Sequence, residues 1–368
     1  MTYNVQKLNK ISPVINGVFD SKYNLVDACD DPDGILVRSF NMAEYPVGKK
    51  LVAIGRAGAG VNNIPVADMA KAGVVVFNTP GANANAVKEL VLCGMLLASR
   101  DIIGGNRWVN NLTEDVAKAT EKGKSAFGGT EIYGKTLGVV GLGAIGVLVA
   151  NAALSLGMKV IGYDPYLSEE NKAKLNAAVK VVSLDEIFTG SDIITLHVPL
   201  LDATKGMINA DAIAKMKDGV IILNMARGAL VNVADLKKAI AEKKVRKYVV
   251  DFPDETVLNS DGIIVLPHLG ASTEEAEDNC AEMAAKQLVD YIENGNVKNS
   301  VNYPSISKER TGKTRTCVLF DAAALPAIEK ISGDKKTAIK GCYGYAIIDS
   351  NDPVALDGIE GIIRVRVL

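Results

Sequence analysis

The feature that most constrains this chain is a glycine-rich segment that follows an apolar strand. Residues 136–146 read Thr-Leu-Gly-Val-Val-Gly-Leu-Gly-Ala-Ile-Gly and end in the pattern Gly141-x-Gly143-x-x-Gly146. The first glycine of such a pattern permits a tight turn, the second lets the backbone approach a pyrophosphate, and the third lets the next helix pack closely on the sheet. Three glycines at this spacing also occur in ordinary turns, so the surrounding sequence decides between the two interpretations.

The surrounding sequence favours a dinucleotide. A helical stretch from Ile145 to Leu156 follows the glycines, and the free N–H groups at the start of a helix bind phosphate. A second apolar strand, residues 159–163, ends in Asp164, which lies 18 residues after Gly146. An acidic side chain at this place binds the ribose hydroxyl groups of the adenosine half and repels a 2′-phosphate, and no arginine follows it. We therefore predict NAD, rather than NADP, as the cofactor.

Short apolar strands alternate with helical stretches along most of the chain, which predicts an α/β fold. The expected strands are residues 34–38, 51–55, 74–78, 137–141, 160–163, 193–197, 220–224, 248–251 and 263–266. Alternation of this kind is typical of parallel sheets with crossover helices. With 368 residues, the chain is long enough for two or three domains.

Two long helical stretches, residues 84–109 and 273–294, flank the dinucleotide-binding segment. We therefore expect the chain to leave a first domain and to return to it. The predicted domains are a discontinuous, flavodoxin-like substrate-binding domain of residues 1–95 and 285–304, a Rossmann-like NAD-binding domain of residues 96–284, and a small α+β domain of residues 305–368. In the last of these we expect β, α, β, α and β elements at residues 314–319, 325–331, 337–348, 354–359 and 362–368.

The composition argues against several classes of function. A net charge of −2 with 23% charged residues provides no general attraction to nucleic acid or to anionic membranes. No apolar run approaches the roughly 20 residues that a membrane-spanning helix needs. The five cysteines are scattered and form no Cys-x-x-Cys pair, which favours thiols in a reducing cytoplasm over a disulfide framework or a metal site. We expect a cytoplasmic protein that binds no metal and whose ligands are small molecules.

Polar side chains follow three of the expected strands, where open α/β sheets bind their ligands. The chain has only two histidines, and His197 and His268 both lie at strand ends. Hydride transfer to a carbonyl requires a proton donor, for which either imidazole is a candidate, although a single histidine is more often structural. Arg227 ends a third strand, and its planar guanidinium suits a carboxylate. Asp254 and Glu255 are candidates to pair with His268 and favour imidazolium, unless they are simply solvated.

A second glycine cluster, residues 55–63, has Asn63 where a dinucleotide loop would have its third glycine. We therefore reject a second dinucleotide site. Small residues after a strand instead present backbone N–H groups to a small anion, and Arg56 adds positive charge to them. A plain tight turn is the alternative interpretation.

These segments together resemble the D-isomer-specific 2-hydroxyacid dehydrogenases over nearly the whole chain. The resemblance rests on residues 55–60, 78–83, 141–146, 163–165, 197–199, 226–228, 267–273 and 299–304, in that order. It is closest to the family members that act on 3-phospho-D-glycerate, because Arg56 in the first loop is similar to that of enzymes with a phosphorylated substrate. The resemblance implies NAD-dependent oxidation of 3-phospho-D-glycerate to 3-phosphooxypyruvate, the first step toward serine, by a homodimer or higher homo-oligomer.

The resemblance also implies roles for individual residues. His268 would be the general acid/base, Glu255 its carboxylate partner, and Arg227 the clamp on the substrate. The implied cofactor-binding residues are Gly141, Gly143, Ala144, Ile145, Gly146, Asp164, His197, Val198, Pro199, Met225, Ala226, Asp251, Gly270 and Ala271. The implied substrate-binding residues are Arg56, Ala57, Gly58, Ala59, Asn83, Arg227 and His268.

Two departures from the family pattern limit the resemblance. The family shows Asp-Val-Phe-x-x-Glu-Pro, whereas residues 251–256 read Asp-Phe-Pro-Asp-Glu-Thr and reach the acid one residue earlier. The partner of His268 is therefore open between Glu255 and Asp254. The tail is similar to an ACT regulatory domain but is shortened, and residues 321–326 lack the Asn-x-Pro-Gly turn, so we expect an assembly domain with weak or absent serine feedback.

Two other functions remain open at this stage. One is a different D-2-hydroxyacid dehydrogenase, either a hydroxypyruvate/glyoxylate reductase or a D-lactate dehydrogenase. The other is a non-catalytic NAD-binding scaffold, like the transcriptional co-repressors that share this fold.

Overall fold

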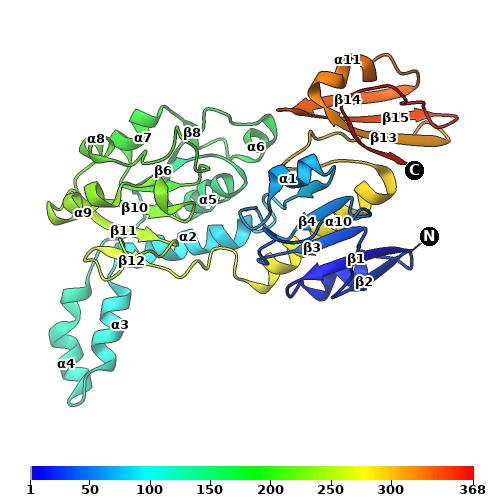
Figure 1. Cartoon of the computed structure of the whole chain (residues 1–368). Helices are drawn as coiled ribbons and strands as arrows, with labels where there is room; N and C mark the ends of the chain where they lie inside the picture. The colour runs from blue at the N-terminus through cyan, green and yellow to red at the C-terminus, as the bar shows by residue number, and fades with distance from the viewer. Residues whose placement is uncertain (1) are drawn as a thin grey trace. The chain divides into compact units, whose positions relative to one another are not determined.

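The computed structural model describes residues 2–368, which divide into two compact units (Figure 1). Unit 1 contains the residues up to Asn83 together with Glu274–Leu368, and unit 2 is Ala84–Thr273. These unit boundaries differ from the domain boundaries predicted between residues 95 and 96 and between residues 284 and 285, because each of two long helices lies entirely within one unit. Helix α2 (Ala84–Ser99) contacts α5, β10 and β11 of unit 2, whereas α10 (Glu274–Asn294) contacts β3, β4 and β5 of unit 1.

Unit 2 is built on a seven-stranded parallel sheet in the order β12-β11-β10-β9-β6-β7-β8. This is the dinucleotide-binding order 3-2-1-4-5-6 with one strand added at the edge, and it reverses between β6 and β9. The strands are β6 (Thr136–Val140), β7 (Lys159–Tyr163), β8 (Lys180–Val181), β9 (Ile193–Leu196), β10 (Val220–Asn224), β11 (Val245–Val250) and β12 (Ile263–Val265). A helix follows each of the strands β6 to β10 along the chain, and these helices are, in order, α5 (Ala144–Ser155), α6 (Glu169–Lys174), α7 (Leu184–Gly190), α8 (Ala210–Lys215) and α9 (Val233–Ala241).

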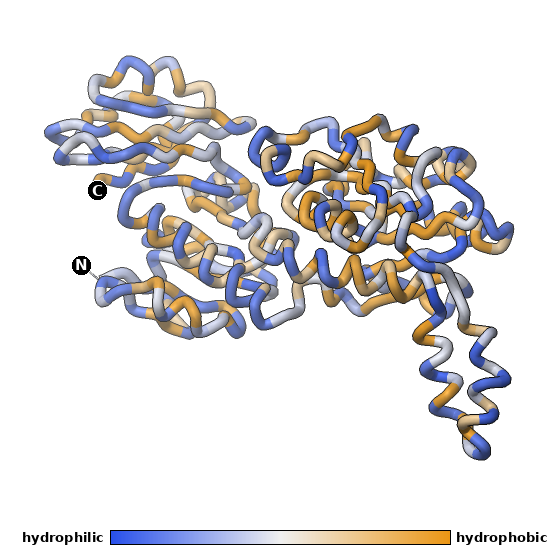
Figure 2. The backbone as a smooth tube through the Cα atoms, turned by 180° about the vertical axis from the view of Figure 1, so that it is seen from behind, coloured by the Kyte–Doolittle hydropathy of each residue, from blue (hydrophilic) through white to orange (hydrophobic). Residues whose placement is uncertain are grey.

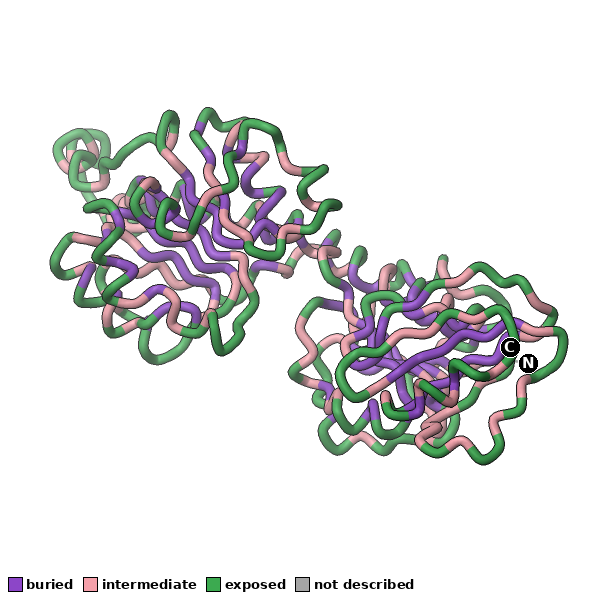
Figure 3. The backbone as a smooth tube through the Cα atoms, turned by 90° about the horizontal axis from the view of Figure 1, so that it is seen from above, coloured by how far each residue is buried: buried purple, intermediate pink, exposed green. Residues whose placement is uncertain are grey.

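The central strands of unit 2 are buried along their length, as Figure 3 shows. Every residue of β9 and of β10 is buried. A parallel sheet covered by helices on both faces needs such continuous apolar strands, rather than alternating ones. This burial explains why the sequence identified these strands so clearly.

The single helix expected over residues 84–109 is two helices, so that prediction was wrong. Helix α2 ends at Ser99, and α3 (Ile102–Asn110) begins after Asp101, whose carboxylate accepts a hydrogen bond from the Gly104 N–H at 3.1 Å. An aspartate in this role starts a new helix, which apolar periodicity alone does not reveal. Helices α3 and α4 (Val116–Gly123) have no buried residue, extend away from the sheet of unit 2 (Figure 1), and alternate hydrophobic with hydrophilic residues (Figure 2).

Unit 1 contains a five-stranded parallel sheet in the order β2-β1-β3-β4-β5. This is the flavodoxin-like order, as expected. Its strands are β1 (Tyr3–Leu8), β2 (Tyr23–Val26), β3 (Gly34–Val37), β4 (Ala53–Arg56) and β5 (Val75–Phe77), and α1 (Val66–Lys71) precedes β5. Strands β1 and β2 were not predicted from the sequence, because they contain polar residues and residues that are only partly buried.

The C-terminal residues form a four-stranded antiparallel sheet in the order β14-β15-β13-β16. Its elements are β13 (Thr314–Asp321), α11 (Leu325–Ile328), β14 (Asp334–Lys340), β15 (Tyr343–Ser350) and β16 (Ile362–Val367). Two predictions were wrong here. Residues 337–348 form a hairpin around Gly341, which has φ 59°, and residues 354–359 contain no helix.

The C-terminal sheet shares a hydrophobic core with the rest of unit 1. Cys317, Leu319 and Tyr345 are buried in one cluster with Phe77 and Tyr291. Residues 305–368 therefore pack as part of unit 1, and their sheet also has a small hydrophobic cluster of its own, which includes Val318, Phe320 and Ile348. Within residues 2–368, no helix combines the length and apolar character needed to cross a membrane.

Candidate functional site

Each glycine of the fingerprint has its own spatial reason in unit 2. Gly141 has φ 96°, and a Cβ there would lie 2.8 Å from the carbonyl carbon of His197. At Gly146 a Cβ would lie 1.9 Å from the carbonyl oxygen of Gly141, so only glycine lets α5 start this close to the strand. A Cβ at Gly143 would meet nothing within 4 Å. The fold itself therefore requires Gly141 and Gly146, whereas Gly143 leaves open space beside the helix start, which fits the approach of a pyrophosphate.

Asp164 lies directly beside this loop. One carboxylate oxygen accepts a hydrogen bond from the Leu142 N–H at 2.9 Å, and the other accepts one from the Tyr166 N–H at 2.8 Å. These two bonds fix the carboxylate at the end of β7, next to the glycines. A fixed acceptor in this position suits ribose hydroxyl groups.

The two histidines have different environments. His197 follows β9, and its Nε2 lies 2.9 Å from Thr195 Oγ1. Burial lowers the pKa of His197 to about 4, so this imidazole is neutral near pH 7. His268 is exposed and follows β12. A half-buried, neutral ring suits packing along a cofactor, which leaves His268 as the candidate acid/base.

The backbone before Arg227 is held by Asn224, a fully buried residue at the end of β10. Its Nδ2 donates to the Arg227 carbonyl oxygen at 2.9 Å and to the Tyr248 hydroxyl at 3.0 Å. Its Oδ1 accepts from the N–H groups of Ala226 and Arg227 at 3.1 and 3.3 Å. The exposed Arg227 side chain is thus presented by a rigid turn. No role was predicted for Asn224, although a polar residue directly after the apolar run Val-Ile-Ile-Leu indicates a special function at the strand end.

Asp251 holds the loop that carries His268. Its carboxylate is buried, with the residue only 1% exposed, and accepts hydrogen bonds from the N–H groups of Leu269 and Gly270, both at 2.8 Å. His268 has a backbone φ of 58°, a conformation that residues other than glycine rarely adopt. Two charge-assisted hydrogen bonds to the next two residues stabilise this backbone. Asp251 therefore positions the loop in addition to the cofactor role expected of it.

The carboxylates proposed to pair with His268 lie in an exposed turn. Asp254 Oδ1 accepts a hydrogen bond from the Thr256 N–H at 2.8 Å, and the Thr256 hydroxyl lowers the pKa of Asp254. Glu255 is exposed. Across residues 2–368, neither carboxylate forms a hydrogen bond or an ion pair with His268. The ring that does contact His268 is Phe252, with centroids 4.7 Å apart.

The other expected cofactor residues also follow strand ends in unit 2. Ala144 and Ile145 open α5, and Val198 and Pro199 follow His197. The Pro199 carbonyl accepts a hydrogen bond from the Thr204 hydroxyl at 2.6 Å, which holds that turn. Met225 directly follows β10, but its side chain is buried against α2, where a Cβ at Gly94 would be 2.7 Å from its Cε. Ala271 lies just beyond Gly270 in the loop of His268.

The expected substrate loop lies in unit 1, after β4. A Cβ at Gly58 would be 1.8 Å from Nη1 of Arg56, so the guanidinium lies directly over the Gly58 backbone. Asn78 Nδ2 donates to the Ala59 carbonyl at 2.7 Å, and the Thr79 N–H donates to the Gly58 carbonyl at 3.1 Å. Ala57 is buried, and Asn83 is the last residue before α2. The loop is thus fixed, with Arg56 folded over it.

Comparison with known proteins identifies the family. Residues 92–270 match the family described as D-isomer specific 2-hydroxyacid dehydrogenase, NAD binding domain. This chain contains the NAD-binding domain of the D-isomer specific 2-hydroxyacid dehydrogenases. The match confirms the resemblance seen in the sequence and the prediction of NAD as the cofactor.

Individual members of the family are similar over most of this chain. D-3-phosphoglycerate dehydrogenase of Methanocaldococcus jannaschii is 37% identical over 309 residues, which are 82% of this chain and 57% of that protein. The Synechocystis sp. protein of the same name is 33% identical over 354 residues, 93% of this chain and 62% of its own. Among solved structures, NAD⁺-bound 3-phosphoglycerate dehydrogenase of Entamoeba histolytica matches with a TM-score of 0.65 and 28% identity, covering 82% of this chain and 99% of that one. This chain spans about three fifths of the length of the curated relatives that it matches.

Proposed function

We propose that this protein is an NAD-dependent 2-hydroxyacid dehydrogenase that oxidises 3-phospho-D-glycerate to 3-phosphooxypyruvate. The observation that carries the proposal is the arrangement at the carboxyl edge of the unit 2 sheet. There, the imidazole of His268 and the guanidinium of Arg227 both lie against the ring of Phe252. A guanidinium and an imidazole close together supply the carboxylate grip and the proton transfer that this reaction requires. The names of the relatives support the choice of substrate.

In the proposed mechanism, Arg227 binds the substrate carboxylate and orients the carbon that carries the hydroxyl group. Neutral His268 accepts the hydroxyl proton as the C–O bond gains double-bond character. NAD⁺, held at the Gly141–Gly146 loop and by Asp164, would supply the acceptor for the hydride that leaves the same carbon. In the reverse direction, the imidazolium of His268 returns the proton to the carbonyl oxygen. A positioned acid/base of this kind typically contributes about 10²–10⁴-fold in rate.

The carboxylate partner of His268 stays a proposal. We assign it to Glu255, because Asp254 already accepts hydrogen bonds within the turn at Thr256. Glu255 is exposed, so a change in its side-chain conformation requires no repacking. In this role Glu255 would favour the imidazolium formed during oxidation.

Arg56 is proposed to bind the phosphate of the substrate. Its guanidinium lies over a loop of small residues, where backbone N–H groups and a cation favour an anion. Substrates without a phosphate would gain little from this interaction. Arg56 is therefore the residue that separates phosphoglycerate oxidation from glyoxylate reduction or D-lactate oxidation.

We also propose that the C-terminal sheet is an ACT-like assembly module with weak or absent serine feedback, in a cytoplasmic homodimer or higher homo-oligomer. The β-α-β-β-β order of this region is that of a β-α-β-β-α-β module without its second helix, and the segment between β15 and β16 is short. Rates measured with and without serine test this point. Strong inhibition by serine would contradict it.

The central test is an assay of NADH formation with 3-phospho-D-glycerate, D-glycerate, D-lactate and glycolate. We expect turnover to be fastest with the phosphorylated acid. His268→Asn should remove most of the turnover and leave NAD binding nearly unchanged, so a variant that keeps more than about a tenth of the rate would contradict the role of His268. No turnover with any acid, at high enzyme concentration, would favour the non-catalytic scaffold.

A second experiment isolates the phosphate. Arg56→Met should reduce kcat/KM for 3-phospho-D-glycerate by far more than it reduces kcat/KM for an unphosphorylated acid. Arg38→Met is the matched control, because Arg38 is another arginine of unit 1 whose guanidinium pairs with Glu277 at 2.7 Å. Equal losses for all acids in Arg56→Met would indicate a substrate without a phosphate.

A further inference from the structure

We propose that Phe252 is a positioning residue that aligns His268 and Arg227 through one shared aromatic ring. The Phe252 and His268 rings are 4.7 Å apart at their centroids and inclined by 49°. The Arg227 guanidinium carbon lies 5.7 Å from the centroid of the same phenyl ring. This inference deepens the proposed function, since it concerns the two side chains assigned to proton transfer and substrate binding.

The phenyl ring has a rigid support. Phe252 directly follows Asp251, whose buried carboxylate binds the backbone of the His268 loop at Leu269 and Gly270. On the other side, a Cβ at Gly228 would lie 3.6 Å from the Phe252 Cβ, so the backbone after Arg227 passes close to the ring. The position of the ring is therefore set by the end of β11 and by the turns that carry both functional side chains.

His268 and Arg227 have little else to hold them. Both side chains are exposed, and the only hydrogen bond of the Arg227 guanidinium within the described chain goes to the neighbouring Ala226 carbonyl, at 2.6 Å. Neither Asp254 nor Glu255 bonds to His268 in residues 2–368. An aromatic ring attracts a guanidinium or an imidazolium at its face and prefers tilted contact with a second ring. Phe252 thus supplies the alignment that a carboxylate does not supply in this arrangement.

The place of the ring in the sequence departs from the family pattern. The family pattern has valine directly after the aspartate and phenylalanine one residue later, whereas here Phe252 follows Asp251 immediately and the segment is one residue shorter.

Two substitutions separate the aromatic contact from simple packing. Phe252→Leu keeps an apolar side chain of similar size without a ring, and Phe252→Tyr keeps the ring. We expect Phe252→Leu to lower kcat with 3-phospho-D-glycerate by roughly tenfold to a hundredfold, as misplaced reacting groups do, while NAD affinity and Tm stay close to those of the unchanged protein. Phe252→Tyr should restore kcat to within about twofold. Wild-type kcat in Phe252→Leu, or equal losses in both variants, would overturn the proposal.

A measurement without turnover tests the same contact. Since the chain has only two histidines, NMR of imidazole-labelled protein gives two sets of ring signals, and His268→Asn identifies one of them. Loss of the phenyl ring current in Phe252→Leu should shift the His268 signals and leave those of His197 unchanged. Unchanged His268 signals would overturn the proposal. If these signals shift but no acid is oxidised by the unmodified protein, the positioning role stands and the proposed reaction fails.

Discussion

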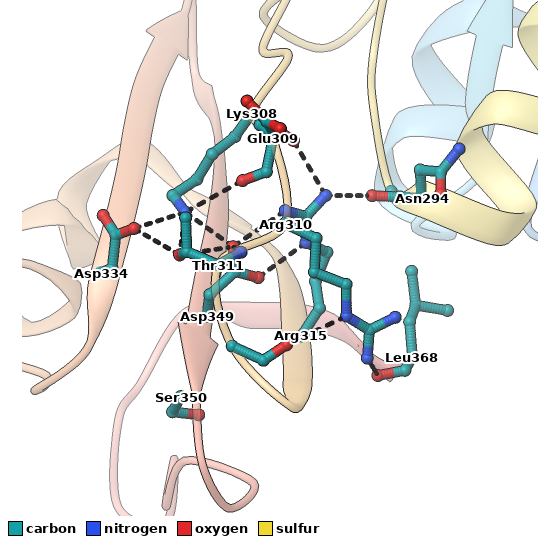
Figure 4. A network of polar contacts seen from close by, with 12 residues as sticks. Asn294, Lys308, Glu309, Arg310, Thr311, Arg315, Asp334, Asp349, Ser350 and Leu368 are labelled. Atoms are coloured by element: carbon teal, nitrogen blue, oxygen red, sulfur yellow. Dashed lines mark hydrogen bonds and ion pairs between the residues drawn. The ribbon is translucent and has the colours of Figure 1, made fainter.

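Arg315 and Asp349 form a two-point ion pair in the interior of unit 1. Nε of Arg315 lies 2.7 Å from Oδ1 of Asp349, and Nη2 lies 2.8 Å from Oδ2 (Figure 4). Nη1 also donates to the carbonyls of Asn294 and Lys308, at 2.8 and 3.0 Å. Burial by itself would raise the pKa of Asp349, but hydrogen bonds from Arg315 and Lys308 hold that pKa well below its usual range. One buried pair therefore joins β13, β15, the end of α10 and the segment before β13.

Breaking this pair should destabilise unit 1. Asp349→Asn would leave the Arg315 guanidinium without a countercharge, and removing one partner of a buried pair costs about 3–5 kcal/mol. The measurement is urea unfolding followed by far-UV circular dichroism, because Trp108, the single tryptophan, lies in unit 2. Lys71→Ala is the control: its pair with Asp68 spans 3.5 Å on the surface, and its loss should cost at most about 1 kcal/mol. Equal effects of the two substitutions would contradict the prediction.

The end of α10 depends on the C-terminal sheet. Arg366 of β16 donates to the Tyr291 and Ile292 carbonyls at 3.0 and 2.7 Å, and the Tyr345 hydroxyl donates to the Gly295 carbonyl at 2.5 Å. Such donors satisfy carbonyls that a helix end leaves free, and the positive charge suits the helix dipole.

Arg366→Leu should therefore lower the free energy of unfolding by roughly 1.5–3 kcal/mol, the range for hydrogen bonds that involve a charged group. Hydrogen exchange of the last turn of α10 should rise in parallel. Lys286→Ala, on the exposed side of the same helix, should have little effect on either measurement. Unchanged exchange in Arg366→Leu would show that the cap contributes nothing.

Two fingerprint glycines should respond differently to alanine. Gly143→Ala places a methyl group in open space, so the fold should keep its Tm while NAD binding weakens severalfold or more, as the methyl group occupies the path of the pyrophosphate. Gly146→Ala would place a methyl group 1.9 Å from the Gly141 carbonyl oxygen, so both Tm and NAD binding should fall. Titration with NAD and thermal unfolding check both variants. A wild-type affinity in Gly143→Ala would contradict the assigned phosphate approach.

Stability should depend on pH through His197. Its pKa is lowered to about 4 by burial, so the unfolded chain binds the proton more readily than the folded one. The resulting stabilisation is fully present above the ordinary value near pH 6.5 and is lost as the pH falls toward 4, by up to roughly 3 kcal/mol. In His197→Gln the slope of the unfolding free energy between pH 6.5 and 4 should decrease. If unfolding free energy in His197→Gln falls with pH as steeply as in the unchanged protein, the pH dependence originates from another group.

The sequence by itself determined the local features of this protein. Six of the seven strands of the unit 2 sheet (all except β8), the glycine loop, Asp164 at the end of β7, and the placement of Arg227 and His268 at strand ends follow from short-range patterns. These patterns are readable because a doubly covered parallel strand has to be apolar along its whole length and a tight approach of backbone requires glycine. The partly polar strands β1 and β2 lack that signal and were missed.

The tertiary structure decided everything that depends on contacts between distant residues. It distinguished the half-buried, neutral His197 from the exposed His268, although both follow strands. It joined residues 314–367 to the core of unit 1 through Arg315, Tyr345 and Arg366, and it brought the Phe252 ring against both His268 and Arg227. Burial, ion pairing and ring contacts arise from positions far apart in the chain, and no local period or spacing in the sequence encodes them.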